Sequence, residues 1–307
     1  YEGGNLEELK IHLESVEFQA ARDENLREVI SGAAAVYCRD LLSLRYLERM
    51  NWLKGLSGLG PDATFACDLR DDARGDSYLQ FVGLEADEFI CVVPRLRWTP
   101  LGKVYGLPPS THSRARDAVN ARTVESDLAP LRKLIIKWVE GTQRKVLLCP
   151  EMTYQVALAK EQLFDPLPLS VREKVIWRDS YWLNGEASSV YARALAVVSL
   201  ENHSPILAIA QGTPAFYLRQ PTDTIKGAMW HNLGMGDWYY EIGNFQVDDL
   251  WEKLLTLSRA PATWRRMART HQQHAYELLK ATARASMERS LLLGPGYLEG
   301  PMEEMNA

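Results

Sequence analysis

The fold class is decided by residues 197–218, VVSLENHSPILAIAQGTPAFYL. This stretch contains a short apolar strand, a polar turn, a helix of small residues and a second apolar strand. Successive strands that pair in parallel need a crossover connection, which is usually a helix. The pattern therefore predicts a parallel sheet with helices packed against it.

The same alternation continues on both sides of this stretch. We expect strands at 144–150, 174–179, 195–200 and 214–218, and helices at 126–141, 151–161, 185–194, 204–211 and 224–234. Alternating strands and helices are typical of an α/β protein whose parallel sheet is covered on both faces.

The first hundred residues have a similar but less regular pattern. Apolar residues recur at helical spacing over 6–30, and apolar runs predict strands at 33–38, 63–69 and 87–96. A helix is expected at 41–54, and GLSGLGPD at 55–62 has the composition of a turn. These elements predict a first Rossmann-like lobe.

The chain length favours two lobes, because single hydrophobic cores stop growing at about 250–300 residues. Residues 99–125 are rich in Pro, Gly, Ser and Arg without periodicity, which predicts a connecting loop. We expect an N-terminal lobe at 1–98, a C-terminal lobe at 126–261, and a final helix and tail at 262–307 that packs across the first lobe. Because the chain opens with a polar segment and no preceding strand, the N-terminal lobe is expected to be incomplete.

Composition restricts the classes of partner. The 35 basic and 40 acidic residues give a formal charge of −5, which disfavours nucleic acid and anionic lipid as partners. The four cysteines lack the close spacing of a zinc site or redox pair, so we expect no bound metal and no cofactor. No apolar run approaches the ~18–20 residues of a membrane span, so we expect a cytoplasmic protein. The sequence leaves both a monomer and a homo-oligomer open.

The turn after the expected strand 195–200 is the first candidate site. In open parallel sheets the ligand binds beyond the carboxyl ends of the strands. Backbone N–H groups at the start of the next helix, near Ser204, would favour an anion, and His203 could exchange a proton beside it. The alternative is a histidine that only hydrogen-bonds the turn. Ser199 and Glu201 belong to the same turn.

Other charged residues also follow expected strands. Arg39 could hold a carboxylate or phosphate while Asp40 caps the next helix, or the two could form a local pair and cap. Arg95 and Arg97 repeat the argument, although exposed arginines at strand ends are common. Lys226 could reach an anion near His203, or could be solvated.

Missing motifs narrow the chemistry further. The sequence contains no GxGxxG, GxxxxGK[ST], GxSxG or HExxH, which removes the usual support for dinucleotide redox chemistry, P-loop binding, serine hydrolysis and zinc proteolysis. Several aromatic residues could stack on a sugar ring or pack in the core. They are Trp177, Trp182, Trp230, Trp238, Tyr239 and Tyr240.

Three segments carry a resemblance to a known family: AAAVYCRDLLSLRYL at 33–47, GPDATFACDL at 60–69, and residues 186–238. Over roughly residues 20–260 the chain resembles polysaccharide pyruvyl transferases. The resemblance implies two facing Rossmann-like domains of the glycosyltransferase-B type. It also implies transfer of a pyruvyl group from phosphoenolpyruvate to a saccharide or lipid-linked saccharide, as in exopolysaccharide biosynthesis for the cell envelope.

By the same resemblance, His203, Arg39 and Lys226 would be the donor-binding and catalytic residues. We expect the substrate-binding residues to be Ser199, Glu201, Ser204, Arg95, Arg97 and Asp40. The family carries Arg where this chain has Glu201, and a carboxylate there would repel phosphoenolpyruvate. Two alternatives therefore stand: a nucleotide-sugar-dependent glycosyltransferase of the same fold, or a binding protein that has lost catalysis.

Overall fold

The larger of two parallel sheets has six strands in the order β5-β4-β3-β6-β7-β8. The computed structural model describes the backbone of residues 16–293, and the side chains of residues 23–292 except those of Thr224 and Lys226. The strands are β3 (Phe89–Val93), β4 (Lys145–Leu148), β5 (Val175–Trp177), β6 (Ala196–Ser199), β7 (Ala215–Arg219) and β8 (Tyr239–Glu241). Strand order reverses between β3 and β6, as in doubly wound nucleotide-binding folds.

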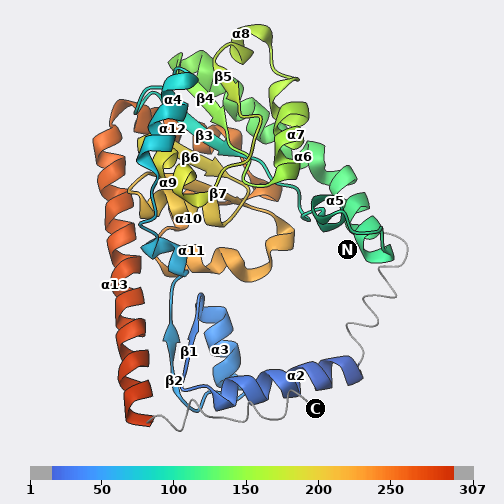
Figure 1. The fold of residues 1–307 in the computed structure, drawn as a ribbon, viewed down its shortest axis with the longest axis vertical. Helices are drawn as coiled ribbons and strands as arrows, with labels where there is room; N and C mark the ends of the chain where they lie inside the picture. The colour runs from blue at the N-terminus through green and yellow to red at the C-terminus, as the bar shows by residue number, and fades with distance from the viewer. Residues whose placement is uncertain (1–15, 294–307) are drawn as a thin grey trace.

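Helices pack around this sheet in two groups. α6 (Thr111–Thr142) contacts α8 (Leu169–Arg172) and α12 (Val247–Arg259). α9 (Asn184–Arg193) contacts α4 (Asp72–Phe81) and α10 (His203–Ala210). In Figure 1 the sheet lies between α6 and α7 (Thr153–Ala159) on one side and the last helix, α13, on the other. None of the described helices combines the length and apolar character needed to cross a bilayer.

The smaller sheet pairs β1 (Ala35–Cys38) with β2 (Leu56–Leu59) in parallel, with Cys38 opposite Leu59. α2 (Val16–Gly32) and α3 (Leu41–Arg49) accompany it at the lower end of the molecule in Figure 1. Both strands end at the same edge, so Arg39 and Asp62 follow neighbouring strand ends.

A single long helix joins the two sheets. α13 (Pro261–Leu293) contacts α10 beside the larger sheet, and also β1 and β2 of the smaller one (Figure 1). The described part of the predicted tail 262–307 is thus one helix, and this helix contacts the smaller sheet. The predicted α/β class with parallel sheets is confirmed.

One strand belongs to the other sheet. The strand predicted at 87–96 forms as β3, but it pairs with β4 and β6 in the middle of the larger sheet rather than with β1. All five residues of β3 are buried, which suits a central strand with helices on both faces.

The expected connecting loop at 99–125 is wrong. A short helix, α5 (Leu101–Tyr105), ends at Gly106, and α6 begins at Thr111 and continues through the helix predicted at 126–141. Ser110 and Ser113 form a capping box that starts α6. The prolines and glycines of 99–125 all lie before Ser110, so the second part of this segment is free to form a helix. The average composition of the whole segment concealed this difference.

The strand predicted at 63–69 is also wrong. Asp62 accepts a hydrogen bond from the Thr64 N–H at 3.0 Å and caps a 3₁₀ helix, η1 (Ala63–Ala66). The second strand of the small sheet is β2, inside the expected turn 55–62. The expected helix at 224–234 is split into η3 (Pro221–Gly227) and α11 (Ala228–Asn232). The part of the first predicted helix before residue 16 lies outside the described residues.

The remaining elements are short. They are η2, a π-helical turn (Lys160–Phe164), η4 (Gly236–Trp238) and η5 (Ile242–Asn244).

Candidate functional site

The carboxyl edges of the two sheets meet at one place. The chain adds strands on one side of β3 first and then on its other side, starting with β6, so the strand order reverses between β3 and β6. Ligands bind at such a switch point in open α/β sheets. Arg95 follows β3, and Glu201 and His203 follow β6. From the smaller sheet, Asp62 follows β2 and approaches His203, with 3.7 Å between the carboxylate and Nε2.

A row of alternating charges crosses this meeting point. We define the charge chain as Arg39, Asp62, His203, Glu201, Arg95 and Asp223. Its first half joins the sheets: Arg39 Nη1 lies 2.5 Å from the Asp62 carboxylate, and His203 Nδ1 lies 3.1 Å from Glu201 Oε1. His203 is half exposed, so the imidazole is held between two carboxylates at the surface.

The second half of the charge chain is more deeply buried. Arg95 Nε lies 2.9 Å from Glu201 Oε2, and its Nη1 lies 2.5 Å from Asp223 Oδ1. Asp223 also accepts a hydrogen bond from the Tyr217 hydroxyl at 2.7 Å. Glu201, the residue that departs from the pyruvyl transferase pattern, thus links the arginine to the histidine.

These pairings set the ionisation of the site. Burial alone would raise the pKa of Glu201, but the hydrogen bond with His203 and the nearby Arg95 charge lower it to about 2. The hydrogen bond with Glu201, opposed by burial, raises the pKa of His203. Burial opposes ionisation of Asp62, yet hydrogen bonds from Thr64 and Arg39 lower its pKa. At neutral pH Glu201 and Asp62 are therefore charged. A larger fraction of the His203 imidazole is protonated than in a free histidine.

The predicted anion site is filled by the chain itself. Glu201 Oε1 lies 3.5 Å from the His203 backbone N–H, at the start of α10 where an external anion was expected. The cations Arg39, His203 and Arg95 each have a carboxylate partner. The charge chain therefore carries no net excess of positive charge for a phosphate or carboxylate ligand.

Two predicted serines belong to the same turn. Ser199 Oγ donates to the Glu201 carbonyl at 2.8 Å and accepts from the Glu201 N–H at 2.9 Å, which fixes the turn after β6. Ser204 Oγ is buried beside Glu151, and its interaction with that carboxyl group acts to lower the pKa of Glu151.

Three other predicted residues have structural partners. Asp40 caps α3 by accepting from the Ser43 N–H at 2.7 Å, so the capping interpretation is confirmed. Arg97 forms a two-pronged ion pair with Asp127, with nitrogen–oxygen distances of 2.8 and 3.0 Å. Arg95 and Arg97 are partly buried, so they are not the exposed strand-end arginines of the alternative interpretation. Lys226 lies in η3, and its side chain lies outside the described residues.

Glu151 is a candidate that sequence reasoning missed. It follows β4, next to the switch point, and accepts a hydrogen bond from the Tyr191 hydroxyl at 2.8 Å. Burial raises the pKa of Glu151 to about 7, and the neighbouring Glu201 charge acts in the same direction. A carboxyl group with such a pKa can donate or accept a proton near neutral pH. Its position directly after the predicted strand 144–150 was the available signal.

The aromatic residues that could either stack on a sugar ring or pack in the core fall into two groups. Trp230 and Trp238 are fully buried, and Trp230 Nε1 donates to Asn202 at 3.1 Å, so both pack in the core. Trp182 is buried too, beneath the Arg178 guanidinium. Trp177, Tyr239 and Tyr240 are only partly buried.

Known proteins resemble this chain only distantly. No family model matches this chain, and no curated protein matches it. Among solved structures it is similar to a UDP-forming α,α-trehalose-phosphate synthase from Burkholderia xenovorans, with 8% identity and a TM-score of 0.48 over 88% of this chain and 62% of that one. A second, from Burkholderia vietnamiensis, has 8% identity and a TM-score of 0.45 over 88% and 63%. The chain thus spans less than two thirds of either protein, and similarity this distant does not bear on its reaction.

Proposed function

We propose that this chain is a glycosyltransferase that moves a sugar from a nucleotide-sugar donor to a saccharide acceptor, at the meeting point of its two sheets. The observation that carries the proposal is the charge chain at the switch point, in which His203 is held between the carboxylates of Glu201 and Asp62. Carboxylates accept hydrogen bonds from hydroxyl groups, and a neighbouring imidazole can exchange the hydroxyl proton. A hydroxyl-rich ligand suits such a site.

The same pairings disfavour pyruvyl transfer. Phosphoenolpyruvate carries a phosphate and a carboxylate on one three-carbon unit, so it needs several cations that are not already neutralised. Arg39 and Arg95 are each bound to a carboxylate. Glu201 adds repulsion at the turn where the donor would lie. In a nucleotide-sugar donor, the sugar hydroxyl groups would lie there, and the diphosphate would lie outside the charge chain.

Ligand-induced stabilisation separates the candidate functions. We expect at least one of UDP, GDP and ADP to raise the melting temperature of the protein, and phosphoenolpyruvate to leave it unchanged. Stabilisation by phosphoenolpyruvate, together with acceptor-dependent phosphate release, would support pyruvyl transfer and refute the proposal. Stabilisation by none of these ligands would favour a binding protein without catalysis.

A direct activity measurement completes the test. Release of nucleoside diphosphate from nucleotide sugars should depend on an added saccharide, and His203→Ala should reduce the rate by roughly a hundredfold or more. His274→Ala, a histidine of α13 outside the charge chain, is the matched control and should retain the wild-type rate. Equal rates for both variants would remove His203 from the mechanism.

A further inference from the structure

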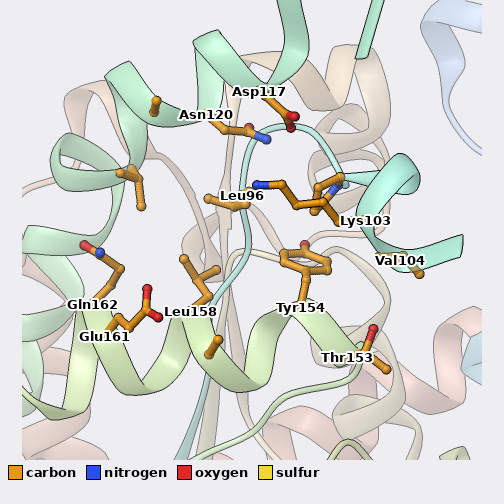
Figure 2. Close-up of a pocket in the computed structure, with 14 residues that line it drawn as sticks. Leu96, Lys103, Val104, Asp117, Asn120, Thr153, Tyr154, Leu158, Glu161 and Gln162 are labelled. Atoms are coloured by element: carbon orange, nitrogen blue, oxygen red, sulfur yellow. The ribbon is translucent and has the colours of Figure 1, made fainter. Parts of the chain in front are cut away.

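A cavity of about 610 Å³ lies between α5, α6 and α7, beside the switch point (Figure 2). This volume is within the range of about 300–1,000 Å³ that is usual for small-molecule sites. Most of its wall is apolar, formed by Leu96, Pro100, Val104, Ala121, Val124, Ala157 and Leu158. The sequence prediction missed the cavity because it treated 99–125 as a loop, whereas α5 and α6 build two of its walls.

Asn120, one of the polar residues in this cavity, exchanges two hydrogen bonds with the Trp98 backbone, but several others have no such partner. The Tyr154 hydroxyl is shielded from solvent and has no hydrogen-bond partner within the described part of the chain. Lys103, Asp117 and Glu161 also line the cavity, and no ion pair or hydrogen bond joins their side chains to another described residue. In Figure 2 the Lys103 and Tyr154 side chains both extend into the space between the helices. The shielded Tyr154 hydroxyl favours a ligand that supplies a partner, whereas Lys103 and Glu161 are exposed and can contact a ligand from the cavity mouth.

The charges of the cavity define the class of ligand. One ammonium group, on Lys103, and two carboxylates, on Asp117 and Glu161, line the cavity. This balance repels a phosphate-rich ligand, whereas carboxylates accept hydrogen bonds from hydroxyls and an ammonium group donates to an oxygen. The Tyr154 ring and the aliphatic wall provide a surface for the apolar face of a sugar ring.

The cavity is also close to the proposed reaction centre. Leu96 directly follows Arg95 of the charge chain, and Tyr154 lies three residues after Glu151. A ligand in the cavity therefore has access to the carboxyl ends of β3 and β4. This position suits the acceptor of the transfer.

From these contacts we infer that the cavity between α5, α6 and α7 binds an uncharged saccharide, which serves as the acceptor. The inference rests on the proposed function for the acceptor role, but the binding of a neutral sugar follows from the cavity alone. The apolar wall, the partnerless Tyr154 hydroxyl and the mixed charges are the observations that carry it.

Calorimetric titration of the full chain with glucose, mannose and maltose tests the inference. We expect at least one sugar to bind, and Ala157→Trp, which fills the cavity from the exposed face of α7, to weaken binding at least tenfold. Ala283→Trp, on the exposed face of α13, is the matched control and should bind as the wild type does. Unchanged affinity in Ala157→Trp, or no binding of any of the sugars to the wild type, would overturn the inference.

A second variant distinguishes loss of sugar binding from loss of folding. The double variant Asp117→Asn, Glu161→Gln keeps the cavity size and removes both carboxylates, so it should weaken the same sugar at least fivefold while circular dichroism stays unchanged. Nucleoside diphosphate stabilisation should be equal in wild type and Ala157→Trp. If no nucleotide stabilises the wild type but sugar binding still depends on Ala157, the glycosyltransferase proposal fails and the saccharide site stands.

Discussion

His203 lies between two carboxylates, and this arrangement makes the stability of the fold depend on pH. Because its folded pKa is raised, the stabilisation is complete below the unfolded value of about 6.5 and is lost as pH rises through the folded pKa. We expect His203→Gln to remove this dependence. The effect should be a few tenths of a kcal/mol, since the imidazole is half exposed. Urea unfolding at pH 6 and pH 8.5 measures it, and equal pH slopes in both proteins would contradict it.

Glu151 produces a similar dependence in a different pH window. Its folded pKa of about 7 is above the ordinary value of 4.5, so the folded state binds the proton more tightly and loses stability as pH rises between these values. We expect Glu151→Gln to be more stable than the wild type at pH 8, by roughly 1–3 kcal/mol. The two proteins should differ least near pH 4. A difference that does not change with pH would show that the carboxyl group is not buried in this way.

Glu201 connects Arg95 to His203, so its replacement should be costly. Glu201→Arg introduces the residue of the pyruvyl transferase pattern, but places it beside two cations. We expect a loss of roughly 2–4 kcal/mol in the free energy of unfolding, because a partly buried ion pair is broken and like charges meet. Glu88→Gln, which breaks an exposed pair with Arg144, should cost less than about 1 kcal/mol. Chemical unfolding compares the variants, and equal losses would refute the argument.

Helix packing depends on one close approach between α4 and α9. A Cβ added at Gly75 would lie 2.6 Å from the Ser189 Cβ, a distance that requires the helices to separate. We expect Gly75→Ala to destabilise the protein by about 1–3 kcal/mol. Gly243→Ala is the control, because no atom lies within 4 Å of its added Cβ. A comparison of melting temperatures tests this, and equal stability of the two variants would contradict the packing.

The elements of the larger sheet were predictable from sequence because its strands are buried and apolar. β4, β6 and β7 form within the predicted ranges or within one residue of them, and periodicity alone identified them. β2 was not predictable in this way, because LSGL is half exposed and contains a glycine. Its strand conformation comes from pairing with β1 and not from its own apolar pattern. β8 is only partly buried and contains no apolar run like the one that predicted β5, so it was not predicted.

The sequence predicted where several candidate site residues lie, but not which residues they pair with. The rule that ligands bind at strand ends selected Arg95, Glu201 and His203, and these three residues lie together in the structure. It could not show that they neutralise one another, since Asp223 and Asp62 come from distant segments. It also missed the cavity of Figure 2, which exists only because three helices enclose it.

The two sheets share the buried face of α13, so one substitution there should affect the entire molecule. Ala275, in the middle of α13, is fully buried, and Ala275→Arg would place a large charged group on the buried face of this helix. We expect a loss of more than about 3 kcal/mol. Ala283→Arg, at an exposed position of the same helix, should change stability by less than about 0.5 kcal/mol. Denaturant titration followed by tryptophan fluorescence measures both, and a mild effect at Ala275 would refute the shared contact.

A helix of 33 residues is a stiff rod of about 50 Å, and α13 is attached to both sheets. Movement of one sheet relative to the other must therefore pivot on this rod or bend it, and must also disturb the packing of η1 on α10 and of α3 on α11. Asp62 follows β2 and His203 begins α10, so the distance between them reports the relative position of the two sheets.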